Sequence, residues 1–295
     1  MTKENNNNNN NFSSEKIVEN LSDFALFLSV MKNREAYECI LSIILDEPNL
    51  ELKQVKVEEV ILNQPGKRAI RLDAWAESID ERQFNMEMQN DTKKDEVPKR
   101  SRFYQGLMDV PILKSGKNTK YKQLPSTIII FITQEDIFGR DCAMYEFTEQ
   151  CESVQGLHLG DGTKKTFLNM VSKNGRAELV SLLQYMKDSR LDNPELIVLD
   201  DRLIRLNKIV AEVKESEEWE EIRMTIMEYA MEKGTEIGKE IGKEIGKEIG
   251  IRAFVLDSIE ENRPMEIVLD KLERLFTLDE IQARMYYDKF SNFIQ

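Results

Sequence analysis

The stretch that decides the fold is AIRLDAWAESIDERQFNMEMQN, residues 69–90. It contains two runs in which apolar and polar residues alternate, separated by a polar turn around Asp80. Because successive side chains of a strand point to opposite faces of a sheet, this alternation predicts two strands, each with one buried face, joined as a hairpin. A hairpin centred on Asp80 makes Asp73 and Glu87 direct cross-strand partners.

Two carboxylates at such opposed positions destabilise a sheet unless something compensates their charge, since their Cβ atoms lie roughly 4.5–5.5 Å apart. A divalent cation would compensate it. Gln89 shares the face of Glu87, so the hairpin presents Asp73, Glu87 and Gln89 as one cluster. The alternation alone also fits two ordinary solvated carboxylates on a half-exposed sheet.

The segments on either side of this hairpin predict an α/β core in the order α-β-β-β-α-β. Apolar spacings of three and four predict one or two helices over residues 24–45, and alternation predicts a strand at 54–62. A helical pattern at 95–113 is followed by STIIIFIT, residues 126–133, which is typical of a strand buried on both faces. Further strands are expected at 142–150 and 165–171, and further helices at 176–188 and 201–233.

The charge of the chain is unevenly distributed. The net charge of −13 argues against a protein that coats nucleic acid by general electrostatics. Residues 93–122, however, contain nine basic and three acidic residues, a net +6 that leaves −19 for the remainder. This uneven distribution of charge favours a nucleic-acid groove on one face of an otherwise acidic protein. A solvated lysine-rich loop explains the same number of basic residues.

Cysteine, histidine and hydropathy limit the remaining function classes. Cys39, Cys142 and Cys151 have neither disulfide-scaffold pairing nor zinc-site spacing. The single histidine, His158, excludes chemistry that needs two imidazoles, and we interpret it as structural. No apolar run is long enough to span a membrane and the N-terminal residues lack a signal-peptide core, so we expect a cytoplasmic protein.

Several blocks of sequence resemble, in order and spacing, the recombination-promoting nuclease and transposase family of the PD-(D/E)XK nuclease superfamily. They are MKNREAYECILSIIL at 31–45, RLDAWAE at 71–77, NMEMQN at 85–90, PKRSRFYQGLMD at 98–109 and LGDGTKKTFLN at 159–169. The similarity runs from about residue 24 to about residue 233. It implies a PD-(D/E)XK core with a mixed central sheet, and a DNA endonuclease that promotes recombination or mobile-element activity.

The resemblance also implies a site. Asp73, Glu87 and Gln89 would be catalytic, with Gln89 standing where many superfamily members have lysine. The metal would be Mg²⁺ or Mn²⁺, which oxygen ligands favour. Its expected ligands are Asp73, Glu87, Met88 and Glu35, with Glu38 as an alternative to Glu35. The expected nucleic-acid contacts are Lys99, Arg100, Arg102, Tyr104 and Gln105.

Two other functions remain open at this stage. A nuclease fold that has lost its activity, with Gln89 as the sign of the loss, would bind nucleic acid or a protein partner without cutting. A toxin-like nuclease that acts on RNA is the other alternative.

The last third of the chain contains an internal repeat, GTEIGKEIGKEIGKEIG, at residues 234–250. Isoleucine at every fourth position predicts a helix that acts as a spacer or associates with a second copy, whereas the repeated glycines fit a linker equally well. Short helices are expected at 263–276 and 277–290, the second with a capping box at Thr277 and Glu280. Residues 252–295 carry a net charge of −3, which favours helical packing over DNA reading.

These segments predict five regions along the chain. They are a disordered asparagine-rich tail at 1–14, a nuclease domain at 15–190, a helical extension at 191–233, the repeat helix or linker at 234–250 and a small helical region at 251–295.

Overall fold

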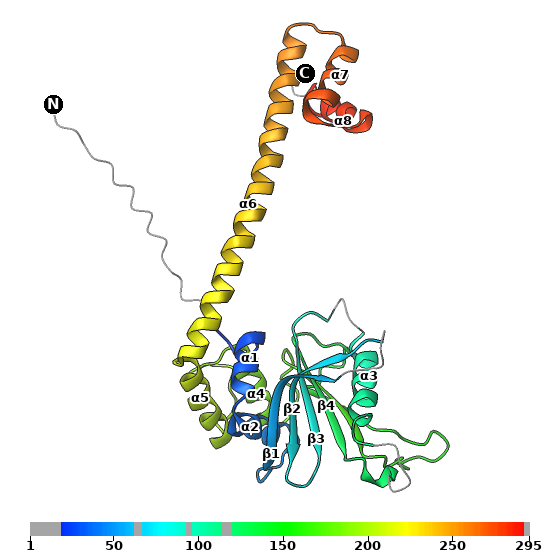
Figure 1. Cartoon of the computed structure of the whole chain (residues 1–295), viewed down its shortest axis with the longest axis vertical. Coiled ribbons are helices and arrows are strands. Elements are labelled where there is room, and N and C mark those ends of the chain that lie inside the picture. Colours follow the sequence, from blue (N-terminus) through cyan, green and yellow to red (C-terminus); the bar gives the residue numbers. More distant parts are fainter. Residues whose placement is uncertain (1–18, 62–66, 93–95, 114–119, 292–295) are drawn as a thin grey trace, which may run out of the picture. The chain divides into compact units, whose positions relative to one another are not determined.

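The computed structural model describes residues 19–61, 67–92, 96–113 and 120–291 (Figure 1). The chain divides into two compact units, the first ending at Glu220 and the second beginning at Glu221. The asparagine-rich tail predicted at 1–14 lies outside the described residues, as do four of the basic residues counted between 93 and 122. These four are Lys93, Lys94, Lys114 and Lys117.

The first unit contains a sheet and its covering helices. The helices are α1 (Phe24–Met31), α2 (Arg34–Leu45), α3 (Val97–Asp109), the 3₁₀ helix η1 (Tyr121–Gln123), α4 (Ala177–Lys187) and α5 (Asp201–Lys214). The strands are β1 (Leu52–Ile61), β2 (Ile70–Ser78), β3 (Gln83–Gln89), β4 (Thr127–Thr133), β5 (Met144–Phe147) and β6 (Thr163–Asn169).

The six strands form one mixed sheet in the order β1-β2-β3-β4-β6-β5. The pairs β1–β2, β2–β3 and β5–β6 are antiparallel, whereas β3–β4 and β4–β6 are parallel. Every residue of β4 is buried, as its continuous apolar run predicts. The predicted α/β fold with a mixed sheet is therefore confirmed.

Helices cover the sheet on both faces (Figure 1). On one face, α3 contributes Val97, Tyr104 and Leu107 to an apolar cluster that includes Phe131 of β4 and Phe167 of β6. The opposite face is covered by the helices around α2 and α4 (Figure 1). Carboxylates on the α3 face of the sheet are consequently removed from water. The prediction that β2 and β3 each have only one buried face did not include this.

The β2–β3 hairpin has the predicted register up to one point. Its backbone pairs run from Glu77↔Gln83 to Ala74↔Met86, all symmetric about Asp80. The strict alternation along β2, however, is interrupted at Asp73, because Leu72 and Trp75 both pack with the α3-side cluster. On the neighbouring strand, Glu58 has a φ of 52° opposite this point. The predicted alternation of faces along β2 is therefore wrong between Leu72 and Trp75.

The second unit consists of helices. Helix α6 (Glu217–Glu260) is continuous through the whole repeat, so residues 234–250 are helical and not an irregular linker. Its C-terminal end packs with α7 (Met265–Phe276) and α8 (Glu280–Ser291) around a small core. The residues of that core are Ile251, Val255, Val268, Leu272, Ala283 and Phe290.

The start of α8 differs from the prediction. Asp279 Oδ1 accepts a hydrogen bond from the Gln282 N–H, and Gln282 Oε1 accepts one from the Asp279 N–H. The reciprocal capping pair is therefore Asp279 with Gln282, and Thr277 instead ends α7 in the left-handed conformation with φ 52°. Separately, the described helices include none whose length and apolarity would allow it to cross a membrane.

Candidate active site

Asp73 and Glu87 meet where the backbone pairing of β2 and β3 ends. Glu87 Oε1 accepts a hydrogen bond from the Asp73 N–H at 3.0 Å, and Asp73 Oδ2 accepts one from the Met88 N–H at 3.2 Å. Each carboxylate thus accepts a hydrogen bond from a main-chain N–H of the other strand. These bonds take the place of the next pair of backbone hydrogen bonds between β2 and β3. Glu87 has no exposed surface and Asp73 is only 7% exposed.

Arg100 of α3 reaches across to these strands and compensates part of their charge. Its Nη2 donates to Glu87 Oε2 at 2.5 Å, and its Nη1 donates to Gln89 Oε1 at 2.7 Å. Its Nε donates to the Tyr104 hydroxyl at 2.9 Å, and its guanidinium lies over the rings of Tyr104 and Phe131. The side chain is thereby held in a defined orientation.

Burial raises the pKa values of both acids above those of ordinary carboxyl groups. Burial raises the pKa of Asp73 to about 6, against the opposing effects of the Met88 N–H and of Arg100. Burial, and then the charge of Asp73, raise the pKa of Glu87 to about 7, against the opposing effect of Arg100. Two neighbouring carboxyl groups whose pKa values are raised by burial, and in one of them also by the charge of the other, are typical of catalytic and metal-binding sites.

Two residues that sequence reasoning did not select complete the surroundings of the pair. Asn85 is fully buried and its Nδ2 donates to Glu87 Oε1 at 3.0 Å. Tyr37 of α2 is fully buried, and its hydroxyl donates to the carbonyl oxygen of Ala74 at 2.8 Å. Asn85 could have been found because it shares the face of Glu87 on β3, whereas nothing in the sequence of α2 distinguished Tyr37.

The acidic residues expected from α2 are not brought to the pair. Glu35 is exposed and lies 3.6 Å from Arg205 of α5. Glu38 accepts a hydrogen bond from the Leu52 N–H at 2.8 Å, which joins α2 to the start of β1. The fourth expected ligand, Met88, has a buried thioether side chain, so only its main chain has an oxygen that a hard cation prefers.

The five residues expected to contact nucleic acid divide into two groups. Lys99 is exposed and pairs with Glu96 at 3.3 Å, and Arg102 is exposed on the outer side of α3. Tyr104 and Gln105 are buried against the sheet, and Arg100 points to Glu87. Helix α3 therefore presents only the first two as a basic surface.

The chemistry of the pair fits a hard divalent cation. Mg²⁺ usually keeps several waters and is bound through one or two carboxylates, so Asp73 and Glu87 form a sufficient protein ligand set. In addition, the amide of Asn85, which donates to Glu87 Oε1 through Nδ2, has a buried Oδ1 without a hydrogen-bond partner. Among the described residues, no group of three or more His, Cys, Asp or Glu side chains is arranged so that it could hold a metal ion, so water or phosphate oxygens would complete the coordination.

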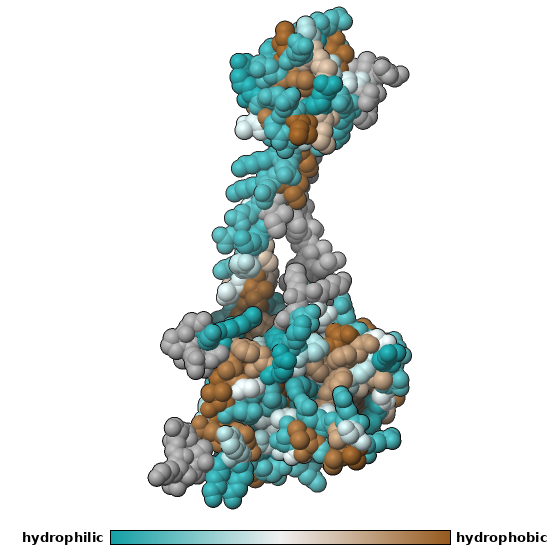
Figure 2. Space-filling view, turned by 90° about the vertical axis from the view of Figure 1, so that its right-hand side faces the viewer, coloured by the Kyte–Doolittle hydropathy of each residue, from teal (hydrophilic) through white to brown (hydrophobic). Residues whose placement is uncertain are grey.

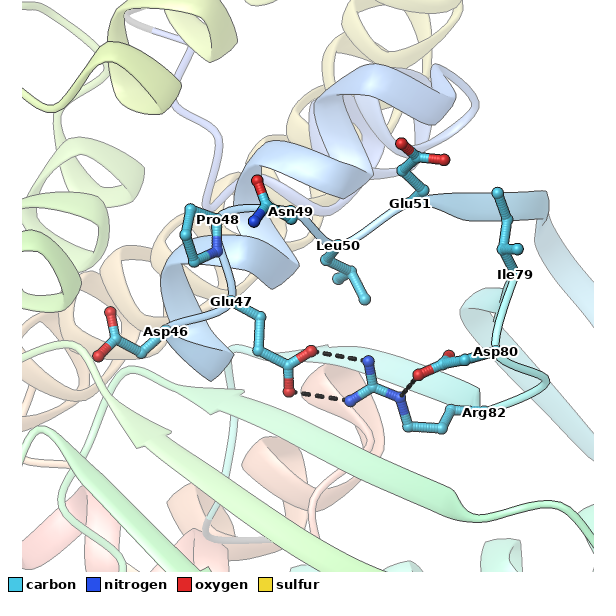
Figure 3. A pocket seen from close by; sticks show the side chains of 9 residues that line it. All are labelled: Asp46, Glu47, Pro48, Asn49, Leu50, Glu51, Ile79, Asp80 and Arg82. Carbon is cyan, nitrogen blue, oxygen red and sulfur yellow. Dashed lines mark hydrogen bonds and ion pairs between the residues drawn. The ribbon is translucent and has the colours of Figure 1, made fainter.

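A cavity of about 530 Å³ lies at the other end of the hairpin (Figure 3). Arg82 crosses it, donating to both carboxylate oxygens of Glu47 at 2.9 and 2.7 Å and to Asp80 at 2.8 Å. Asp80 in this turn lies seven positions along the chain from Asp73, a distance of roughly 20 Å in extended backbone. The cavity is therefore separate from the carboxylate pair, and its ion pairs join the hairpin turn to the end of α2.

Comparison with known proteins yields one match. A model of the PD-(D/E)XK nuclease family transposases matches residues 22–236, which include α1–α5 and the whole sheet. No curated protein and no solved structure matches the chain. Because the matched segment covers well over half of the sequence and contains both carboxylates, the chain belongs to the PD-(D/E)XK nuclease family transposases.

Proposed function

We propose that the protein is a Mg²⁺-dependent DNA endonuclease, which also accepts Mn²⁺, and that it acts in recombination or in the movement of a mobile element. The observation that carries this proposal is the buried Asp73–Glu87 pair, in which two acids with raised pKa values meet one guanidinium. A divalent cation between the two carboxylates would offset the charge that Arg100 leaves uncompensated. Membership of a nuclease family supports the same conclusion.

The residues of the site have distinct roles in this proposal. Asp73 and Glu87 hold the cation, which when bound lowers the pKa of a coordinated water and stabilises negative charge on the phosphate. Gln89, which accepts a hydrogen bond from Arg100, orients the attacking water as an amide where related enzymes use lysine. Arg100, which bonds to Glu87 and Gln89, would have a planar guanidinium within the site that could donate two hydrogen bonds to a phosphate. Lys99 and Arg102 attract the DNA backbone.

The test is cleavage of supercoiled plasmid by the purified protein with Mg²⁺, and with Mg²⁺ plus EDTA. We expect nicked or linear DNA only without EDTA. Asp73→Asn and Glu87→Gln should each lower the cleavage rate by at least about a hundredfold, since each removes a cation ligand. Glu59→Gln, at a half-exposed residue of β1 that pairs with Lys56, is the matched control and should cut like the parent.

A noncatalytic nucleic-acid module is the second candidate, and the ion pair between Arg100 and Glu87 is the observation that favours it. In that case Arg100 substitutes permanently for the cation. The protein would bind DNA with equal affinity with and without EDTA and would leave plasmid intact. The same assay with single-stranded RNA separates the RNA-directed alternative, for which RNA and not plasmid would be degraded.

A further inference from the structure

The repeat in α6 arranges its side chains in four parallel rows. Residues four apart in an α-helix lie in one row, displaced by about 40° at each step. The isoleucine row contains Ile241, Ile245 and Ile249, and the glycine row contains Gly238, Gly242 and Gly246. The lysine row contains Lys239, Lys243 and Lys247, and the glutamate row contains Glu240, Glu244 and Glu248. Around the helix the rows follow in the order glutamate, isoleucine, glycine, lysine.

The isoleucine and glycine rows have no covering within the described chain. Ile241, Ile245 and Ile249 are 51%, 53% and 62% exposed. A Cβ atom added at Gly242 or Gly246 would meet nothing within 4 Å. Figure 2 shows hydrophobic side chains along this part of α6 bordered by hydrophilic ones. A ridge of large apolar side chains thus runs beside an empty groove on the same helix.

The last glycine of the repeat shows what such a groove accepts. A Cβ at Gly250 would lie 3.2 Å from Cε1 of Phe276, so the absence of a side chain there admits an aromatic ring of α7. Ile251, which follows it, is fully buried in the small core of the second unit. The glycine row is therefore filled by an apolar side chain of the same chain at Gly250 and is open from Gly238 to Gly246.

We propose that the open part of this groove is filled by the isoleucine row of a second copy of the chain, which packs against α6 in parallel orientation. Ridges of residues four apart that interdigitate cross at about −50°, the commonest packing of two helices. In a two-fold pair, the isoleucine row of each copy lies in the glycine row of the other. Both rows are then covered at once.

Charge selects the parallel orientation. With isoleucine facing glycine in a parallel pair, the glutamate row of each copy faces the lysine row of the other on both borders of the contact. In an antiparallel pair the order of rows is mirrored, so glutamate faces glutamate and lysine faces lysine, which is unfavourable. Glu248 already pairs with Lys289 of α8, so the available pairs join Glu240 and Glu244 to the partner's lysine row.

The size of this contact determines how strongly the two copies associate, and its place in the chain determines where their sheet-containing units are attached. Crossed helices touch over only a few turns, so the interface is small and the dimer should dissociate on dilution. The glutamate–lysine pairs are exposed and contribute mainly to orientation. Because the sheet-containing unit precedes Glu221 in each copy, both such units are attached to the same end of the helix pair.

The first test is the mass of the full chain by sedimentation over a concentration series. We expect a shift from 34.4 kDa towards twice that value. Gly242→Leu/Gly246→Leu fills the groove and should weaken dimerisation at least tenfold, while the helix signal in circular dichroism stays equal or rises, because leucine favours helix over glycine. Ile281→Gln/Met285→Gln, which alters exposed apolar residues of α8, should leave the dimer unchanged. A monomeric parent, or a groove-filled variant as dimeric as the parent, would overturn the proposal.

The second test is orientation. In protein that carries Cys39→Ser, Cys142→Ser and Cys151→Ser, the variants Gly238→Cys and Gly246→Cys should each crosslink with themselves through a short bis-maleimide. An antiparallel pair centred on Gly242 would instead crosslink only when the two variants are mixed, and that result would contradict the parallel arrangement.

Discussion

At the scale of single residues, the site is defined by two acids and one base that share a water-poor space. Glu87 has no exposed surface, yet it lies beside Asp73 and bonds to the guanidinium of Arg100. A buried carboxylate is stable only if it is paired, hydrogen-bonded or protonated, and all three conditions are partly met here. Without a cation, the stability of this arrangement should therefore depend on pH.

Stability without metal should fall as pH rises through the pKa values of the pair. The folded pKa values, about 6 for Asp73 and about 7 for Glu87, exceed those of unfolded chains, so the folded state binds protons more tightly. The stabilising effect of these protons is complete below pH about 4 and is lost by pH about 8. Relative to Asp73→Asn/Glu87→Gln, the parent should lose up to roughly 6 kcal/mol over this range, because both pKa values are raised by more than two units and each unit corresponds to about 1.4 kcal/mol. Urea unfolding in EDTA at several pH values measures the difference, and a difference that stays constant would refute the assignment.

Removal of Arg100 should make the stability of the protein depend more strongly on a bound cation. Arg100→Gln leaves the carboxylates without their guanidinium and should lower the free energy of unfolding in EDTA by roughly 3 kcal/mol. Mg²⁺ should then raise the melting temperature of this variant more than that of the parent, because the ion no longer displaces a bound side chain. Arg102→Gln, on the exposed side of α3, is the control. Equal Mg²⁺ effects on all three proteins would show that Arg100 and the cation do not compete.

At the scale of elements, the sequence predicted most of what positions the site, and packing decided the rest. Alternation predicted the hairpin register correctly as far as Ala74↔Met86. It could not predict that the alternation breaks between Leu72 and Trp75, where the neighbouring strand has Glu58 in the left-handed conformation, because the sequence pattern gives no sign of that backbone conformation. The family pattern suggested Glu35 from α2, but the rotation of a helix is set by its packing. The structure turns Glu35 towards Arg205 and Tyr37 towards β2.

The hydrogen bond from Tyr37 to Ala74 connects α2 to the residue after Asp73. Tyr37→Phe leaves a buried carbonyl without its donor and should reduce the free energy of unfolding by about 1–2 kcal/mol. We also expect slower plasmid cleavage, since the main chain that carries Asp73 loses support. Tyr185→Phe is matched, because Tyr185 is also buried and its hydroxyl donates to Asn207 at 3.0 Å. That variant should lose similar stability and keep its cleavage rate; equal cleavage by both variants would remove the positioning role of Tyr37.

At the scale of the whole molecule, each of the two units has buried apolar residues of its own in the part of the chain that the structure describes. Those of the first unit lie around the sheet, and those of the second join the end of α6 to α7 and α8. The repeat between residues 234 and 250 is helical, not an irregular linker, but it has no buried face of its own. The four-residue spacing of isoleucine and glycine alone could not distinguish such an exposed helix from a linker or from a helix packed within the chain.

Separate cores should make the units respond separately to mutation. Leu272→Ala removes a fully buried side chain from the second core and should cost about 2–4 kcal/mol of local stability there. Hydrogen exchange followed by mass spectrometry should show faster exchange in residues 251–290 and unchanged exchange in the strands of the sheet. Faster exchange throughout β2, β3 and β4 would contradict this independence.

The central claim, that Asp73 and Glu87 hold one divalent cation, is tested most directly by a crystal structure of the protein grown with Mn²⁺ and measured at a wavelength where manganese scatters anomalously. We predict one strong anomalous peak bound to oxygens of both carboxylates, with the Arg100 guanidinium moved away from Glu87. A structure in which Arg100 still bonds to Glu87 and no manganese lies between the two acids would contradict the account.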